Sequence, residues 1–241
     1  MDGIDRVSGQ ADGMRETAFG MRPPHVVRIA LTGGPAGGKT SLIERAREVL
    51  PSLGYDVLVV NETATEQREN GIIPDDTFDY IDCQWFITEE TIWKERLYER
   101  VAARRIRPVV VLTDRGVLDG KAFLDDDELF EEMLGTWGLD SRSAMEAYDA
   151  VIHLVTAADG AEEHYGNRDN PQRTEDLEGA LWADRRCRSA WEGHPRHHII
   201  GNDVADFAEK MRLATCTLVE LVREARDEAL QAHADAVRLD I

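Results

Sequence analysis

The sequence predicts an α/β fold in which helices flank a parallel sheet of five strands. Three observations predict it: five short apolar runs punctuate the chain, helical or polar segments separate them, and a glycine-rich loop follows the first run. Strands that alternate with helices pair in parallel through right-handed crossovers. The chain has 241 residues and shows no linker or internal repeat, so we expect one domain over residues 25–241.

The predicted strands are the apolar runs, each bounded by turn residues. They cover residues 26–31, 55–60, 108–112, 150–155 and 197–200. The predicted helices cover residues 39–50, which Pro51 should stop, 78–105, 174–191, and a long closing segment capped by Asp203. The mixed, acidic pattern of residues 125–149 predicts short helices. Residues 1–24 lack periodicity and end in two prolines, so we predict a disordered tail there.

The composition is strongly acidic, with 47 acidic and 28 basic residues and a formal net charge of −19. A field of this sign repels phosphate backbones and disfavours a nucleic-acid partner. No apolar run reaches the ~20 residues of a transmembrane helix, and the N-terminus has no apolar stretch typical of a signal peptide. Cys83, Cys187 and Cys216 lack metal-ligand spacing and predict reduced thiols. We therefore expect a cytoplasmic protein.

The glycine-rich segment after the first predicted strand matches the pattern G-x-x-x-x-G-K-[ST]. It consists of Gly33, Gly34, Pro35, Ala36, Gly37, Gly38, Lys39 and Thr40, and Ser41 follows it. Glycines let backbone amides converge on phosphate oxygens, and the following helix adds the positive end of its dipole. A position between a buried strand and a helix distinguishes a P-loop from a chance glycine cluster. We predict that Lys39 contacts the β- and γ-phosphates of ATP or GTP and that the Thr40 hydroxyl ligates Mg²⁺.

Charged residues follow the second and third predicted strands. Ligands of open parallel sheets bind at the carboxyl ends of the strands, which singles out Glu62 and the pair Asp114-Arg115. Asp114 follows an apolar run, in the setting of an acid that holds Mg²⁺ directly or through water. Arg115 is a candidate for clamping the transferring phosphoryl group or an acceptor phosphate, with a structural salt bridge as the alternative. Glu62 is a candidate general base, with a role at a helix start as the alternative.

Two arginines lie in a polar, glycine-containing stretch after the fourth predicted strand. Arg168 and Arg173 are candidates for a mobile lid that closes on transition-state charge, with solvated loop arginines as the alternative. On the long helix, Gln84 and Trp85 could face an acceptor pocket, although core packing is the simpler interpretation.

From about residue 26 to the closing helix, the sequence resembles a family of P-loop ATP/GTP-binding domains of AAA type. This family is similar to the ribosylnicotinamide kinase domain of NadR and to the TRP-channel translocation-defect protein. The resembling segments are GGPAGGKTS at 33–41, NETATE at 61–66 with GIIP at 71–74, TDRG at 113–116, and the stretch 153–202. The last stretch is the most specific to the family, because the first motif occurs in P-loop proteins at large.

The resemblance implies a sheet of nucleoside/nucleotide-kinase type with the strand order 2-3-1-4-5. It also implies that Glu62 and Asp114 face the γ-phosphate, that a lid contains Arg173, and that a loop near His194 and Asn202 contacts the nucleotide base. The sequence departs from the family at Gly201, where an aspartate usually precedes the asparagine.

Two functions remain open at this point. The acid after the second strand and the arginine-bearing stretch favour an ATP- or GTP-dependent phosphotransferase of the nucleoside/nucleotide-kinase class, acting on a small metabolite. The absence of a recognisable acceptor motif favours instead a nucleotide-binding regulatory NTPase or switch with a protein or lipid partner. A nucleic-acid-processing ATPase is disfavoured by the charge.

Overall fold

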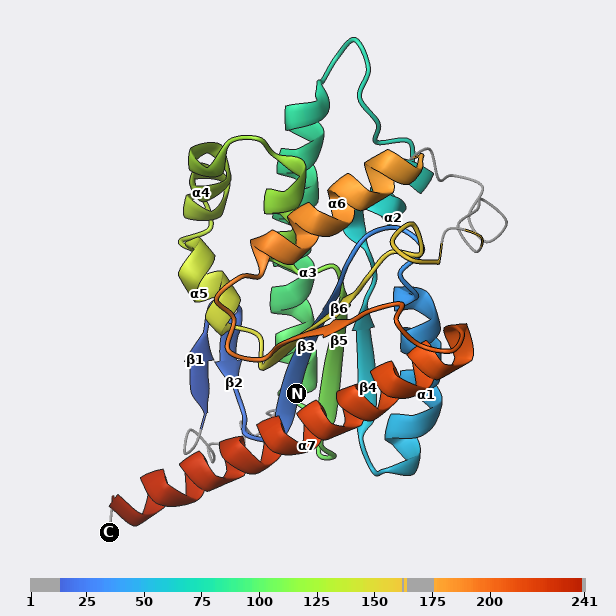
Figure 1. Cartoon of the computed structure of the whole chain (residues 1–241). Helices are drawn as coiled ribbons and strands as arrows, with labels where there is room; N and C mark the ends of the chain where they lie inside the picture. The colour runs from blue at the N-terminus through green and yellow to red at the C-terminus, as the bar shows by residue number, and fades with distance from the viewer. Residues whose placement is uncertain (1–13, 162, 164–175, 240–241) are drawn as a thin grey trace.

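A computed structural model shows a five-stranded parallel sheet with helices on both faces (Figure 1). It describes residues 14–161, 163 and 176–239. The strands of this sheet are β3 Val26–Thr32, β4 Asp56–Val60, β5 Val109–Asp114, β6 Ala150–Leu154 and β7 His197–Ile200. They pair in the order β4-β5-β3-β6-β7. All five predicted strands are confirmed, with small differences at their ends.

Strand β3 lies at the centre of the sheet because it pairs with β5 on one side and with β6 on the other. Its register places Leu31 opposite Asp114 of β5 and Ile152 of β6. Parallel strands end at the same edge of a sheet, so the loops that follow β3, β4, β5 and β6 emerge together. That edge carries most of the residues singled out in the sequence.

The helices connect the strands in alternation. They are α1 Lys39–Ser52, α2 Thr63–Glu69, α3 Tyr80–Ala102, the 3-10 helix η1 Val117–Phe123, α4 Asp127–Gly135, α5 Ser141–Glu146, α6 Leu177–Ala190 and α7 Phe207–Leu239. Helix α1 continues past its predicted end and includes Pro51, whose carbonyl accepts from Gly54 N. The predicted cap of α7 was wrong: Asp206, not Asp203, accepts the amide of Glu209.

The two faces of the sheet pack against different helices. On one face, Val27, Ile29 and Leu31 join α1 and α7 in the largest apolar cluster. On the other face, Val26 and Ala30 lie in two further clusters, which include residues of α3, η1, α4 and α5. Burial on both faces explains why the strands are continuous apolar runs in the sequence.

One charged residue of the central strand is buried on the α3 face. Arg28 is fully buried and forms ion pairs with Glu95 and Glu99 of α3. Glu99 also pairs with Arg22 at 2.6 Å, and the Tyr148 hydroxyl donates to Glu95 at 2.6 Å. Buried charges are tolerated only when they are paired, and here arginines and carboxylates balance one another.

Part of the segment predicted as a disordered tail is folded. Strands β1 Arg15–Thr17 and β2 Gly20–Arg22 form an antiparallel hairpin. At its turn Phe19 is buried and packs edge-on against Tyr148, with 5.9 Å between ring centroids. Arg22 donates to the carboxylate of Asp149, which lies 127 positions further along the chain. The prediction failed for this part because the stabilising contacts are long-range and leave no local periodicity; residues 1–13 lie outside the described range.

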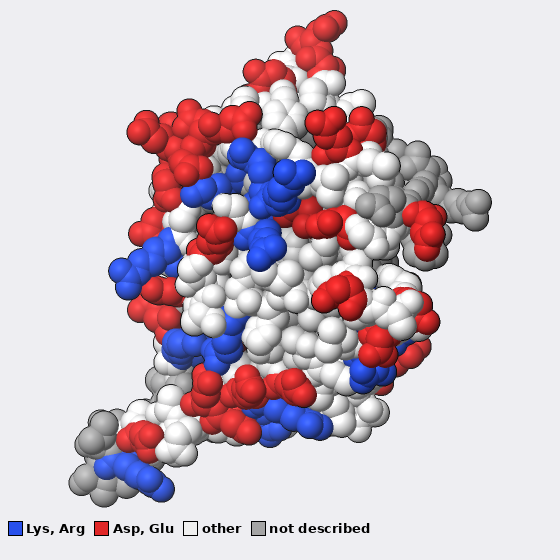
Figure 2. All heavy atoms as spheres, viewed as in Figure 1, with Lys and Arg blue, Asp and Glu red and all other residues white. Residues whose placement is uncertain are grey.

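The side chains on one face of the molecule are mainly acidic where they are charged (Figure 2). Basic side chains on this face form small groups with acidic ones nearby, and one such group lies over α6, which carries Arg185, Arg186 and Arg188. A nucleic-acid backbone would therefore meet much like charge on this face. Among the described helices, none is both long and apolar enough to cross a membrane.

We predict that Phe19→Ala lowers the free energy of unfolding by about 3 kcal/mol, because it empties a filled position of the core. Met21→Ala changes a hairpin residue that is 48% exposed, and should alter stability by less than about 0.5 kcal/mol. Urea unfolding followed by circular dichroism compares both variants with the parent. Equal stability of all three proteins would mean that the hairpin does not dock on the core.

Candidate functional site

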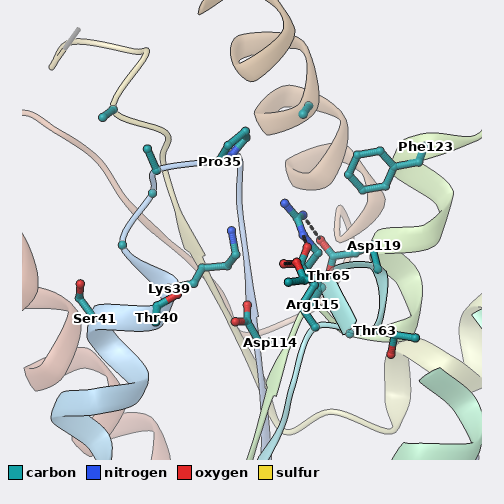
Figure 3. Close-up of a pocket in the computed structure, with 18 of the residues that line it drawn as sticks. Pro35, Lys39, Thr40, Ser41, Thr63, Thr65, Asp114, Arg115, Asp119 and Phe123 are labelled. Atoms are coloured by element: carbon teal, nitrogen blue, oxygen red, sulfur yellow. Dashed lines mark hydrogen bonds and ion pairs between the residues drawn. The ribbon is translucent and has the colours of Figure 1, made fainter. Parts of the chain in front are cut away.

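The carboxyl ends of β3, β4 and β5 open into a cleft of about 1350 Å³. The P-loop forms one wall, the residues after β4 and β5 lie beside it, and α3 with η1 forms the opposite wall (Figure 3). Segments after β6 and β7 also line the cleft. The predicted site residues that line it are Pro35, Ala36, Gly37, Gly38, Lys39, Thr40, Ser41, Glu62, Asp114, Arg115 and Asn202.

Two glycines of the P-loop pass so close to the end of β6 that no side chain would fit. A Cβ on Gly33 would lie 2.1 Å from the carbonyl oxygen of Leu154, and a Cβ on Gly37 would lie 2.3 Å from it. Gly33 and Gly38 also have φ angles of 122° and 103°, in the left-handed region that favours glycine. The glycines are therefore required by packing against β6 as well as by access for phosphate.

An aspartate of α6 holds the beginning of the P-loop. Asp184 Oδ1 accepts from Gly34 N at 2.7 Å and from Thr156 N at 2.9 Å, and Oδ2 lies 3.1 Å from Nε2 of His153. Burial would raise the pKa of Asp184, but its hydrogen bonds and the nearby imidazole outweigh burial and lower the pKa. The Gly34 amide is engaged and Pro35 has no N–H, so the later amides of the loop are the ones left for phosphate.

Lys39 is the first residue of α1, and its side chain extends back over the P-loop. Its Nζ donates to the carbonyls of Gly33 and Gly34, at 3.1 Å each. Burial lowers the pKa of Lys39, the charge of Arg115 lowers it further, and Asp114 opposes the shift. The lysine is thus buried in a site of mixed charge, held by neutral carbonyls that a phosphate can replace.

The start of α1 offers unpaired amides to the same space. The first hydrogen bond of the helix runs from Leu42 N to Gly38 O. The N–H groups of residues 39–41 therefore have no acceptor within the helix. Thr40 and Ser41 line the cleft, and together with the helix dipole these amides form an anion-binding end.

Glu62 and Arg115 pair with each other beside the P-loop. Arg115 Nε donates to Glu62 Oε1 at 2.5 Å, and Glu62 Oε2 accepts from the Thr65 hydroxyl at 2.7 Å. Glu62 is the N-cap residue of α2, as the helix-start alternative has it, but its side chain accepts no backbone amide of the helix. Burial alone would raise the pKa of Glu62, but the charges of Arg115 and Lys39 and two hydrogen bonds lower the pKa to about 2. The salt bridge considered for Arg115 is present.

Arg115 is also fixed by its backbone and by other neighbours. Its φ of 62° lies in the left-handed region, which side-chain-bearing residues seldom adopt and which concentrates at functional sites. Its Nη1 lies 3.1 Å from Cys187 Sγ and 3.6 Å from Asp119 Oδ1. Its guanidinium lies 5.4 Å from the ring centroid of Phe123. Burial in this setting raises the pKa of Cys187 to about 12, so the thiol stays protonated.

Asp114 ends β5 and faces the cleft near Lys39 (Figure 3). Its Oδ1 is buried and has no hydrogen-bond partner. Burial raises its pKa from 3.8 to about 6, with Lys39 opposing the shift and Glu62 adding to it. A buried oxygen without a partner, at a cleft that Thr40 also lines, fits a hard cation that takes oxygen ligands. Among the described residues no cluster of three or more His, Cys, Asp or Glu could hold a metal alone, so further oxygens would come from a ligand.

These features can now be compared with known proteins. The family described as an AAA domain matches residues 28–210, a range that includes the P-loop and the charged residues after β4 and β5. The chain belongs to this AAA domain family. The family is of the P-loop NTPase type, which indicates nucleotide binding with hydrolysis or transfer. A comparison with curated proteins gave no match.

In this AAA domain, Asn202 lines the cleft but its polar atoms are already engaged. Its Nδ2 donates to the carbonyls of Thr156 at 2.8 Å and Asp159 at 2.5 Å, and its Oδ1 accepts from Lys210 Nζ at 2.8 Å. Lys210 also donates to the carbonyl of Val155, and burial lowers its pKa to about 8. Asn202 therefore fixes the loop after β6, and Lys210 is a cleft residue that the sequence analysis missed.

His194 does not line the cleft. It precedes β7, at the opposite edge of the sheet, where its Nε2 lies 3.0 Å from the Tyr148 carbonyl and its Nδ1 accepts from Arg196 N at 3.1 Å. The expectation that it lies near the nucleotide base was wrong, because a loop that enters a parallel strand emerges away from the carboxyl ends. Arg168 and Arg173 lie outside the described residues.

Two acids that shape the site of the AAA domain were missed. Asp184 belongs to the buried side of α6, together with Ala180 and Cys187, so an acid within an apolar helical stripe was the available signal. Asp119 is buried in η1, where its carboxylate accepts from the Thr32 hydroxyl at 2.5 Å and from a tryptophan indole at 3.2 Å. For Asp119 no local pattern pointed to the site.

We predict that Asp114→Asn makes the metal- and nucleotide-free protein more stable near pH 7.5, by on the order of 1–3 kcal/mol. The carboxyl has a higher pKa in the folded protein, about 6, than its ordinary 3.8. Ionisation of this carboxyl therefore lowers the stability of the folded protein. The loss of stability is absent at low pH, develops as the pH rises from about 4 to 6, and is complete above that range.

Urea unfolding near pH 7.5 and near pH 4 tests this expectation. The stabilisation should be much smaller at the lower pH. Asp76→Asn serves as the control, because Asp76 is exposed. A variant at position 114 that is less stable than the parent near pH 7.5 would contradict the assigned cost of burial.

Proposed function

We propose that this AAA domain is an ATP- or GTP-dependent phosphotransferase of the nucleoside/nucleotide-kinase class that acts on a small metabolite. The observation that carries the proposal is the position of Glu62. Its carboxylate lines the same cleft as the P-loop and as the opposite wall of α3 and η1. A carboxylate between a phosphate site and a second wall suits transfer to an acceptor hydroxyl. The sheet order, with the P-loop strand β3 at the centre, supports the kinase type.

In this proposal Mg²⁺ is held by Thr40 and Asp114 together with phosphate oxygens. The support is the unpartnered, buried Oδ1 of Asp114 and the hydroxyl at the motif position. When bound, the cation neutralises charge on the β- and γ-phosphates. Arg168 and Arg173 stay candidates for a lid that adds positive charge in the transition state.

Lys39 and Arg115 must change partners when a triphosphate binds. Lys39 exchanges two neutral carbonyls for phosphate oxygens, because charge-assisted hydrogen bonds are the stronger ones. The same anion competes with Glu62 for Arg115. As phosphate charge offsets both cations, the pKa of Glu62 rises from about 2 toward its ordinary range. The carboxylate can then orient an acceptor hydroxyl and take its proton during transfer.

We predict that Glu62→Gln does not weaken triphosphate binding, since it removes the carboxylate that competes for Arg115, and cuts acceptor-stimulated release of nucleoside diphosphate by roughly 10²–10⁴-fold. The reason is that a general base acts on the acceptor's proton and not on the triphosphate. The measurement is diphosphate production by parent and variant, with and without a pooled metabolite extract. Glu69→Gln, an exposed change on the same helix α2, is the matched control.

The same assay separates the phosphotransferase from a regulatory NTPase. A regulatory NTPase has no acceptor, so no extract would raise its diphosphate release above slow hydrolysis. Tight nucleotide binding by the parent without any stimulation would refute the phosphotransferase proposal.

A further inference from the structure

The wall of the cleft opposite the P-loop carries a polar side chain that the fold does not satisfy. Gln84 of α3 lines the cleft and is only 7% exposed. Within the described chain its side-chain amide makes no hydrogen bond; only its backbone carbonyl has a side-chain partner, the Thr88 hydroxyl. The amide atoms of Gln84 are not sealed from solvent and open to the cleft, so a ligand there can supply the hydrogen-bond partners that the fold does not.

The other polar side chains that α3 presents to the cleft are engaged. The Tyr80 hydroxyl donates to the Phe123 carbonyl at 2.9 Å, which ties α3 to η1. The Thr88 hydroxyl donates to its own helix at 2.8 Å, and the Thr91 hydroxyl donates to α2 at 2.9 Å. Gln84 is therefore the one open hydrogen-bonding group among these described side chains.

The surroundings of Gln84 offer little to a phosphate group on the acceptor. The cation nearest the acid Glu62 is Arg115, which contacts Glu62 and Asp119 and which the triphosphate takes in the proposed reaction, so it is not left for a second phosphate. On this side of the cleft, Arg68 is the described cation that has no ion pair, and it is exposed at the rim. A phosphate group of the acceptor, placed deep in this part of the cleft, would face the carboxylates of Glu62 and Asp119.

Aromatic and apolar groups complete the same wall. Tyr80, Ile87 and Phe123 line the cleft, and Gly120 leaves it open beside Thr88. A Cβ on Gly120 would lie 3.3 Å from the Thr88 hydroxyl and 3.1 Å from a buried phenylalanine ring. A wall that is mostly uncharged and carries one open hydrogen-bonding group suits the recognition of a small molecule.

We propose that Gln84 is the residue with which the cleft recognises the acceptor, and that the acceptor is an uncharged hydroxyl compound with an amide-like edge. This inference rests on the proposed phosphotransferase function and narrows its substrate class. A glutamine amide presents a donor and an acceptor side by side, so it pairs twice with an edge that carries the complementary pair. An acceptor held in this way leaves its hydroxyl free to reach the γ-phosphate.

The transfer step balances with groups already named. The acceptor oxygen forms a bond to the γ-phosphorus while the bond from that phosphorus to the β-γ bridging oxygen breaks. The hydroxyl proton passes to Glu62 and then to solvent, and the nucleoside diphosphate leaves with the bridging oxygen. Gln84 takes no part in this chemistry; it determines which hydroxyl compound is positioned for it.

The test separates a metabolite extract on an anion exchanger into an uncharged and an anionic fraction. Each fraction is added to the protein with magnesium and triphosphate, and diphosphate release is measured for the parent, Gln84→Met and the exposed control Glu89→Gln. We expect the uncharged fraction to stimulate the parent and the control. In Gln84→Met the stimulation should fall by roughly 10- to 100-fold, the loss expected when a buried hydrogen-bonding pair is broken. Triphosphate affinity and unstimulated release should stay unchanged.

Three results would count against the proposal. Stimulation by the anionic fraction alone, or equal stimulation of parent and Gln84→Met by the uncharged fraction, would overturn the inference and leave the phosphotransferase in place. No stimulation by either fraction would overturn the proposed function and the inference together. If Gln84→Met does not fold, Gln84→Asn keeps the amide but withdraws it by one methylene, and should show the same selective loss.

Discussion

The contact between the P-loop and the end of β6 is the constraint on which the rest of the site depends. The Leu154 carbonyl lies too close to Gly33 and Gly37 for either to carry a Cβ, and the Asp184 carboxylate accepts from the backbone amides of both Gly34 and Thr156. The loop, the end of β6 and α6 therefore behave as one unit. Helix α6 also carries Cys187, whose Sγ lies against Arg115 after β5. The position of the P-loop is therefore coupled to the position of Arg115 across the cleft.

Two of the carboxyl groups that line the cleft have pKa values shifted in opposite directions. Glu62 is paired with Arg115, and its pKa falls to about 2, whereas Asp114 keeps an unpartnered oxygen and burial raises its pKa to about 6. Pairs of titratable groups separated in this way are typical of sites where the two acids have different tasks. In the proposed reaction Asp114 holds the cation and Glu62 handles the acceptor's proton. Both tasks depend on a phosphate that draws Arg115 and Lys39 toward itself.

Much of the fold and part of the site could be predicted, because their signals are local. Continuous apolar runs identified the strands, a short motif identified the P-loop, and the rule for carboxyl ends of strands brought Glu62 and Asp114 to one edge. What could not be predicted depends on contacts between distant segments. The docking of Phe19, the clamp by Asp184 and the choice of Glu62 as the partner of Arg115 leave no pattern in neighbouring residues. For His194 the resemblance pointed to the wrong edge of the sheet.

The central claim is that the P-loop, held against β6, is the binding site of a nucleoside triphosphate with magnesium. Titration calorimetry of Gly37→Ala with MgATP and MgGTP tests it most directly, with Gly135→Ala as the control because a Cβ there meets nothing within 4 Å. We expect the parent and the control to bind at least one triphosphate alike. Gly37→Ala should bind it roughly 5- to 100-fold more weakly, since overpacking costs roughly 1–3 kcal/mol. A Gly37→Ala protein that binds as tightly as the parent, or a parent that binds neither triphosphate, would contradict the account.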